Sequence, residues 1–216
     1  MVKDLRRLSL LYGELSRAYQ ELGQFNQAEQ HAQRAMTIYE TLNDRISLAR
    51  SENNLGLLHF KRGDLLQALE HVGRSLDLFE EAGVEVGRAN VLLSLCELHL
   101  ARPDFEEARG YAARALAVAT RAAEPANVAE AHVWLGRVAA AEHDDRAADA
   151  EFHMAFETLE QLGVRERLLR SHALYAEILE ARGDLVGANR HLRRAVAAAQ
   201  GGLAATQVRE SRTASA

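Results

Sequence analysis

Apolar residues recur along most of this chain at every third or fourth position. One such stretch runs through Leu65, Leu66, Leu69, Val72 and Leu76. This spacing places the apolar side chains on one stripe of an α-helix, where they can pack against a neighbour. The pattern predicts amphipathic helices along the chain and therefore an all-α fold.

The helical pattern repeats with a period of 40 residues. One column of equivalent positions holds only alanine: Ala28, Ala68, Ala108, Ala148 and Ala188. A second holds small residues, each preceded by an apolar or aromatic one: Ser16, Gly56, Cys96, Gly136 and Ala176. A third consists of Ala35, Ser75, Ala115, Ala155 and Ala195. Because several columns agree in every unit, we expect five copies of one structural unit.

Each unit divides into two helices at a turn. The turn position holds Gly23, Gly63, Pro103, His143 and Gly183. Glycine ends a helix by accepting a left-handed backbone, and proline because it lacks an N–H donor. Turn residues also mark the unit boundaries, at Asn43-Asp44, Gly83, Glu124-Pro125 and Gly163. The sequence thus predicts about ten helices in five helix-turn-helix repeats, approximately 5–43, 44–83, 84–123, 124–163 and 164–200.

Small residues at fixed places in both helices allow two helix backbones to approach closely. Together with the turn glycine, this arrangement resembles the tetratricopeptide repeat over roughly residues 8–200. The second unit, Ser51 to Gly63, is similar to the long repeats of kinesin light chains, and similar repeats occur in bacterial regulatory proteins. The resemblance implies a right-handed α-solenoid. A HEAT or armadillo array, which has a comparable period, is the alternative.

The repeat pattern ends near residue 200. From Gly201-Gly202 onward the chain is rich in Gly, Ala, Ser, Thr and charged residues, so we predict a repeat domain over 1–200 and a flexible tail over 201–216. The terminal repeat of a solenoid usually needs a polar outer face. Since no further unit covers the last helix, we expect either a piece of a longer protein or a homo-oligomer formed through this helix.

Composition narrows the setting. The formal net charge is −5, which gives no general attraction to nucleic acid, and no apolar stretch is long enough to cross a membrane. The N-terminus lacks the features of a secretory signal, and Cys96 is the only cysteine. These observations predict a cytoplasmic protein with no direct nucleic-acid or membrane partner.

The sequence offers little catalytic chemistry. His59 and His99 occupy the column of Tyr19, which favours packing over metal binding, and the other histidines lack ligand spacing. Phosphate-binding glycine loops and nucleophile elbows are missing from the sequence, and Cys96 lies in the small-residue column. We therefore expect no catalytic residue, no metal and no cofactor, and hence not an enzyme.

The resemblance implies that the first helices of the repeats line a concave groove that holds a protein or peptide. The repeat register assigns these positions to the groove: Arg17, Gln20, Arg50, Asn53, Leu57, Phe60, Asn90, Leu93, Glu97, Glu130, Val133, Arg137, Arg170 and Glu177. Asparagine can pair with a ligand backbone and arginine with carboxylates. The expected function is a protein-interaction or scaffold module of a bacterial regulatory protein; the alternative is a peptide- or small-signal-sensing domain of a transcriptional regulator.

Overall fold

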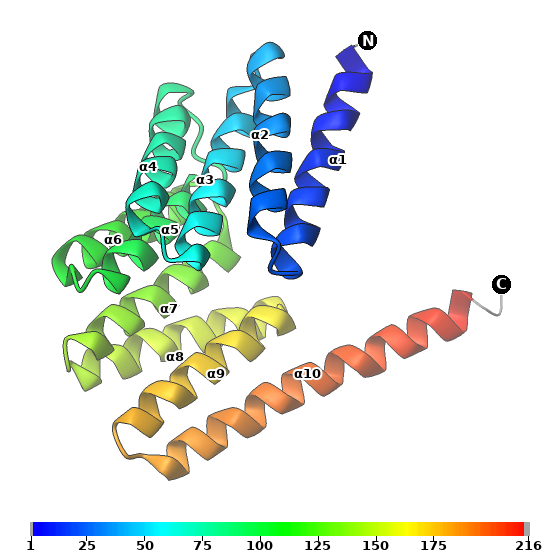
Figure 1. Cartoon of the computed structure of the whole chain (residues 1–216). Helices are drawn as coiled ribbons and strands as arrows, with labels where there is room; N and C mark the ends of the chain where they lie inside the picture. Colours follow the sequence, from blue (N-terminus) through cyan, green and yellow to red (C-terminus); the bar gives the residue numbers. More distant parts are fainter. Residues whose placement is uncertain (1, 214–216) are drawn as a thin grey trace. The chain divides into compact units, whose positions relative to one another are not determined.

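A computed structural model describes residues 2–200 in full and the backbone of residues 201–213. The tail predicted at 201–216 lies outside the fully described residues. Every regular element of the described chain is an α-helix (Figure 1). In chain order they are α1 (Val2–Glu21), α2 (Phe25–Thr41), α3 (Arg45–Arg62), α4 (Leu65–Glu81), α5 (Arg88–Ala101), α6 (Phe105–Arg121), α7 (Pro125–Ala141), α8 (Asp145–Leu162), α9 (Arg165–Ala181) and α10 (Leu185–Thr213). The predictions of an all-α fold and of about ten helices are confirmed.

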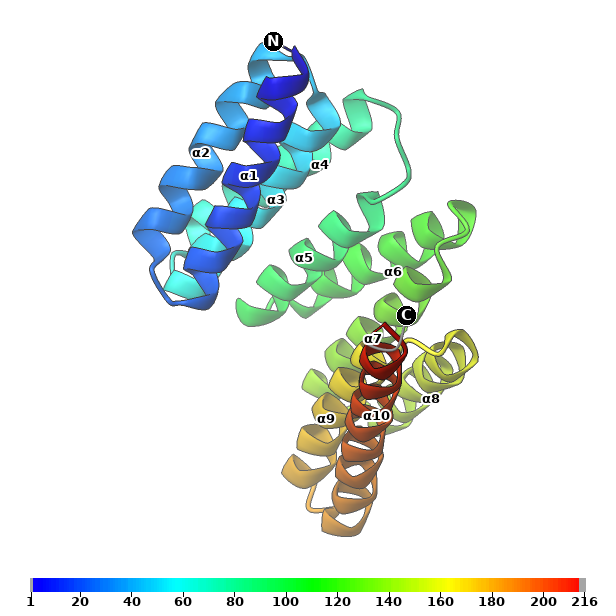
Figure 2. The same cartoon turned by 90° about the vertical axis from the view of Figure 1, so that its right-hand side faces the viewer.

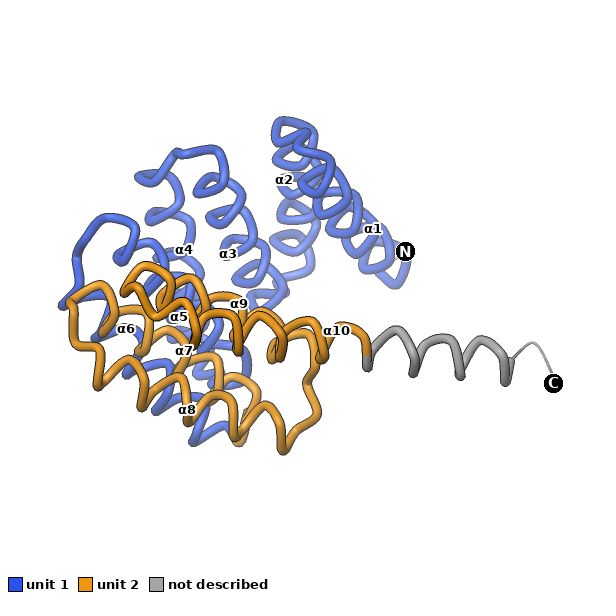
Figure 3. Tube along the Cα trace, turned by 90° about the horizontal axis from the view of Figure 1, so that it is seen from below, with its two compact units in different colours: residues 1–122 blue, residues 123–216 orange. Residues whose placement is uncertain are grey.

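Successive helices form hairpins. The most extensive contacts join α1 with α2, α3 with α4, α5 with α6, α7 with α8 and α9 with α10 (Figure 2). The chain divides into two compact units: unit 1, residues 1–122, holds α1 to α6, and unit 2, residues 123–216, holds α7 to α10 (Figure 3). Within each unit the second helix of a pair packs on the first helix of the next, as α2 on α3, α4 on α5 and α8 on α9. This stacking of helix pairs is that of an α-solenoid. That residues 1–200 form one domain stays a prediction.

Two sets of turns, each with a 40-residue spacing, separate the helices. Within the pairs, φ is positive at Gly23 (70°), Gly63 (89°), His143 (61°) and Gly183 (83°). Between pairs it is positive at Asn43 (51°), Gly83 (64°), Ala123 (53°) and Gly163 (65°). A left-handed residue after the last turn of a helix reverses the chain and satisfies its terminal carbonyls. Ala123 occupies this position although nothing about alanine favours it.

The small-residue columns mark close contacts between the two helices of a pair. Ala28, Ala68, Ala108 and Ala148 have no exposed surface. A Cβ atom at Gly56 would lie 2.5 Å from Cγ2 of Val72 and 3.0 Å from the carbonyl oxygen of Ala68. A Cβ atom at Gly136 would lie 2.8 Å from Cδ2 of Phe152. The predicted role of this column, close approach of two helices, is confirmed in both units.

Rings pack between the two helices of the first three pairs. The ring centroids lie 5.2 Å apart for Tyr19 and His31, 5.1 Å for His59 and His71, and 5.2 Å for His99 and Tyr111. His59 and His99 therefore occupy the place of an aromatic packing residue, as the sequence predicts. Among the described residues, no helix is both long enough and apolar enough to span a bilayer.

Candidate ligand-binding groove

A groove of about 400 Å³ lies on unit 1, between the first helices of its helix pairs. It is lined by Gly13, Ser16, Arg17 and Gln20 of α1, by Asn54, Leu57, Leu58, Phe60 and Lys61 of α3, and by Glu97 of α5. The positions on α3 follow helical spacing, so one face of that helix forms a wall of the groove. The groove thus lies where the repeat register predicts a binding surface.

The groove is lined by both apolar and charged side chains. Leu57 and Phe60 are half-buried, so part of each apolar surface remains open to the solvent in the groove. Arg17 and Lys61 bring exposed cations to the lining, and Glu97 brings a half-buried carboxylate. Apolar surface with a few polar groups around it is typical of sites that bind peptides or small organic ligands.

Gly13 keeps one side of the groove open. A Cβ atom added there would meet no other heavy atom within 4 Å. Glycine within a helix costs about 0.5–1 kcal/mol relative to alanine, and here that cost is not offset by a close helix contact. The open space at Gly13 belongs to the groove, so any larger side chain at this position would reduce the volume left for a ligand.

The structure brings together five of the predicted groove residues: Arg17, Gln20, Leu57, Phe60 and Glu97. Three further ones lie on the same helices but do not line the groove: Arg50 and Asn90 are exposed, and Asn53 is half-buried with Oδ1 shielded and without a hydrogen-bond partner. The register missed the other lining residues, Gly13, Ser16, Asn54, Leu58 and Lys61. The spacing of Asn54 and Lys61 to Leu57 is a signal that could have found these two, since positions three and four apart share a helix face.

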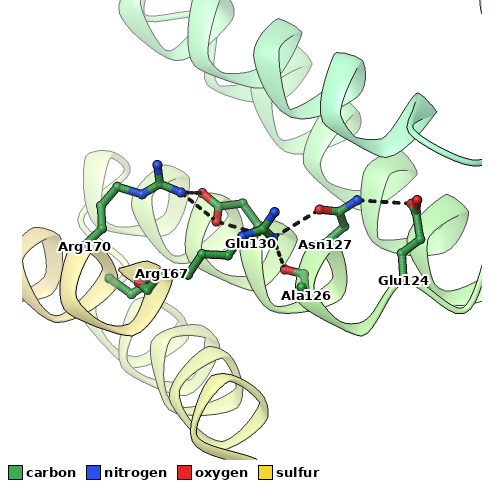
Figure 4. A network of polar contacts seen from close by, with 7 residues as sticks. Glu124, Ala126, Asn127, Glu130, Arg167 and Arg170 are labelled. Atoms are coloured by element: carbon green, nitrogen blue, oxygen red, sulfur yellow. Dashed lines mark hydrogen bonds and ion pairs between the residues drawn. The ribbon is translucent and has the colours of Figure 1, made fainter. Parts of the chain in front are cut away.

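In unit 2, two predicted groove residues contact each other across neighbouring first helices. Nη2 of Arg170 lies 3.1 Å from each carboxylate oxygen of Glu130 (Figure 4). Beside them Nη1 of Arg167 donates to the carbonyl oxygen of Ala126 and, at 3.1 Å, to Oδ1 of Asn127. These contacts tie α9 to α7.

The other unit 2 predictions lie apart from this network. The guanidinium of Arg137 stacks 4.1 Å above the ring of Trp134, a cation–π contact, and Glu177 is exposed.

Two of the predicted groove residues are not on an open surface. Leu93 is 5% exposed and Val133 is 1% exposed, so the expectation that they contact a ligand there is wrong. The register placed them on the exposed face because Asn53 stands at the same position in the second repeat. Residues 91–96 of α5 are all buried, so neighbours cover more of this helix than one stripe. Both side chains are part of the hydrophobic core.

Unusual titratable groups gather between α8, α9 and α10. His172 is almost fully buried, and its Nδ1 lies 3.1 Å from Nδ1 of His191, so one of these nitrogens donates to the other. Burial lowers the pKa of His172 to about 4, with smaller effects from His191 and the cation of Arg194. Burial, together with Arg194 and Arg190, also lowers the pKa of His191. Both rings are therefore neutral at pH 7, and the pair is part of the packing.

Tyr175, next to this pair, donates its hydroxyl to Oδ1 of Asp149 at 2.8 Å. Burial and this hydrogen bond raise the pKa of Tyr175 well above its usual value.

Within the residues whose side chains are described, no three His, Cys, Asp or Glu side chains come together as metal ligands would.

The sequence profile of the tetratricopeptide repeat matches residues 6–81 and 47–121. The chain belongs to the tetratricopeptide repeat family. No curated protein matches it in sequence.

Solved structures with the same fold include three of different sources. BtubC from P. vanneervenii is 23% identical with a TM-score of 0.62, covering 72% of this chain and 64% of its own. A Rap protein complexed with competence and sporulation factor is 16% identical with a TM-score of 0.77, covering 89% of this chain and 54% of its own. Kinesin light chain repeats from Podospora anserina are 20% identical with a TM-score of 0.58, covering 92% and 97%.

The chain spans about half to two thirds of the length of BtubC and of the Rap protein. At these identities the likeness shows the fold alone. The resemblance to kinesin light chain repeats and to repeat domains of bacterial regulators is confirmed at that level, in preference to a HEAT or armadillo array.

Proposed function

We propose that this chain is a protein-interaction module that binds a peptide segment of a partner in the groove of unit 1. The observation that carries the proposal is the groove itself, with Leu57 and Phe60 open to it and cations at Arg17 and Lys61. Binding energy in such sites comes mostly from a few apolar anchors that lose their water on binding. The cations favour a segment with an acidic side chain beside its apolar anchors.

Two structural relatives support a peptide as the ligand. The Rap protein of similar fold is complexed with competence and sporulation factor, and a Rap conjugation gene regulator is in complex with the Phr* peptide. By this analogy of fold we place the chain in a bacterial regulatory or signalling protein of the cytoplasm, acting by binding and not as an enzyme. The second candidate function, favoured by the same two complexes, is a receptor in which a peptide signal shifts the shape of the solenoid; that requires different affinities for two shapes.

Gly13 makes a direct test possible. A Gly13→Met variant fills part of the groove, and because a Cβ at this position meets no atom within 4 Å, the fold should tolerate it. Gly73 of α4 also has open space around it and lies outside the groove, so Gly73→Met is the matched control. We would select peptides from a random displayed library on the unaltered protein and measure their affinity for both variants by fluorescence anisotropy.

The proposal expects the selected peptides to bind Gly73→Met normally and Gly13→Met at least tenfold more weakly, with both variants melting near the parent temperature. Phe60→Ala should also weaken binding by removing an anchor. Peptides that bind all three proteins equally well, or a library that yields no binding peptide, would overturn the proposal. A change in small-angle scattering on peptide binding would favour the receptor over a passive scaffold.

A further inference from the structure

Two helices, α1 and α10, expose the two halves of an interface that is buried inside each unit. In unit 1 the inside of that interface joins α2 to α3, where Ala32 and Met36 share a hydrophobic cluster with Leu55 and Leu58. In unit 2 it joins α8 to α9. There the rings of Phe152 and Tyr175 lie 4.6 Å apart, and those of Phe156 and His172 lie 4.1 Å apart.

The 40-residue register identifies the equivalent positions on α10 and α1. On the last helix, Leu192 and Val196 are equivalent to Phe152 and Phe156, which are buried, yet they are 47% and 54% exposed. Within unit 1 their equivalents Ala32 and Met36 are buried too. The α10 face of Leu192 and Val196, which we call the tail face, is thus the surface that in an internal repeat receives the first helix of the next repeat.

The first helix shows the complementary half. Leu15 is equivalent to Leu55 and Tyr175, which are 2% and 8% exposed, but Leu15 itself is 42% exposed. Leu11 occupies the column of Ser171, which is buried, and is 61% exposed. The α1 face of Leu11 and Leu15, which we call the head face, is the surface that in an internal repeat rests on the second helix of the preceding repeat.

The charged positions at the rim of the internal interface hold uncharged residues on α10 and at the end of α1. Inside unit 1, Glu29 of α2 accepts from Arg62 of α3 at 2.8 Å. Inside unit 2, Asp149 pairs with Arg182 at 2.6 Å. The equivalents on the tail and head faces are Asn189 and Leu22, both uncharged, so apposing the two faces leaves no charge unpaired at this position. Burying an unpaired charge would strongly oppose association.

From these observations we infer that the tail face binds the head face of a second copy of this chain, head to tail, through the same contacts that join successive repeats. The occupant of the tail face is α1 of the next copy, with Leu11 and Leu15 set against Leu192 and Val196. Such a heterologous contact leaves one head face and one tail face free on every pair, so it can extend beyond a dimer. The inference does not depend on the groove of unit 1.

Sedimentation of the full chain at increasing concentration tests the contact. We expect the average mass to rise with concentration. Two double variants separate the faces: Leu11→Glu with Leu15→Glu on the head face, and Leu192→Glu with Val196→Glu on the tail face. Each should remain monomeric alone, while an equimolar mixture should form a two-chain complex and nothing larger, because only one head face and one tail face remain. Leu66→Glu, at a position 80% exposed on α4, is the control and should assemble like the parent.

Other outcomes would overturn the inference. A parent chain that stays monomeric at millimolar concentration would refute the inference by itself. This measurement uses no variant, so it holds even if a variant fails to fold. Assembly that survives in the head-face or the tail-face variant alone would point to a symmetric contact between like faces or to another surface. A mixture of the two variants that does not assemble, although both melt cooperatively, would also contradict it.

Discussion

The buried Glu52 and the half-buried His71 form a polar pair, with Oε2 of Glu52 2.7 Å from Nδ1 of His71. Two repeats later the same two positions hold His132 and Glu151, also 2.7 Å apart, with acid and imidazole exchanged between the helices. In these two repeats either helix can therefore supply the acid, whereas the fifth repeat holds His172 and His191 at the same two positions. Breaking such a pair costs more than its net contribution, because the remaining group keeps its desolvation cost.

This exchange predicts the result of a swap in unit 1. His71→Glu alone places a second carboxylate against that of Glu52, which is only 4% exposed. This change should lower the free energy of unfolding by about 2 kcal/mol or more. The double change Glu52→His with His71→Glu recreates the arrangement of unit 2 and should recover most of that loss. Urea unfolding followed by circular dichroism measures both. A double variant as unstable as the single one would show that the pair is not interchangeable.

The pair of His172 and His191 predicts that the free energy of unfolding depends on pH. Because burial lowers the pKa of His172 to about 4, the unfolded chain takes up a proton near pH 6.5 and the folded chain only near pH 4. The stability of this site is complete above pH 6.5 and is lost as the pH falls from 6.5 to about 4, by on the order of 3 kcal/mol. His172→Phe should flatten that part of the profile when urea unfolding is compared at pH 7, 5.5 and 4. A variant that loses stability over this range as steeply as the parent would contradict the assignment.

Two helical glycines differ in their surroundings, one at a close helix contact and one facing open space. Gly56→Ala brings a Cβ to within 3.0 Å of the carbonyl oxygen of Ala68, and should lower the free energy of unfolding by about 1–3 kcal/mol through overpacking. Gly73→Ala meets no atom within 4 Å and should raise it by about 0.5–1 kcal/mol, because alanine favours the helix. Thermal melts of the two variants should therefore move in opposite directions. Shifts of the same sign would remove the basis for the small-residue column.

The repeat architecture was predictable because its constraints are local and recur. Ala28 and Gly56 must be small wherever two helices touch, so their columns are visible in the sequence. The groove was only partly predictable. Leu57 and Phe60 follow from the register, but Leu93 is buried because neighbours cover α5 on several sides, and a single-helix pattern does not report that.

Contacts between columns were the harder part. The pair of Glu52 and His71 joins positions 19 residues apart on different helices. Its sequence signal is an exchange of residue types with His132 and Glu151, which appears only when two columns are compared. The left-handed turn at Ala123 gives no signal, because alanine is a helix former and its place in the turn is set by the helices on either side.

Left-handed turns offer a route to stabilisation. Ala123 and His143 have φ of 53° and 61°, a region that costs a residue with a Cβ about 1 kcal/mol. Ala123→Gly and His143→Gly should each raise the free energy of unfolding by a few tenths to about 1 kcal/mol, since relief of strain outweighs the added freedom of the unfolded chain. Gly163, at φ 65°, is the reverse control, and Gly163→Ala should destabilise. Lower melting temperatures for both glycine variants would show that these turns are not strained.

The network that joins α7 and α9 predicts unequal roles for its two arginines. Arg167 donates to Oδ1 of Asn127, a residue only 7% exposed, whereas the side chain of Arg170 is 59% exposed where it meets Glu130 (Figure 4). Removing Arg167 leaves a buried amide oxygen without its partner, a loss of about 1–3 kcal/mol. Removing Arg170 breaks an ion pair whose arginine is exposed, worth about 0–1 kcal/mol.

Urea unfolding should therefore rank Arg167→Ala well below Arg170→Ala. Added salt should reduce the effect of Arg170→Ala more, because salt screens an exposed charge more strongly than a buried hydrogen bond. Glu130 can still meet Arg167, 3.9 Å away, when Arg170 is removed, which further limits the cost of that change. Equal losses for the two variants would mean that the hydrogen bond to Asn127 contributes no more than the exposed pair.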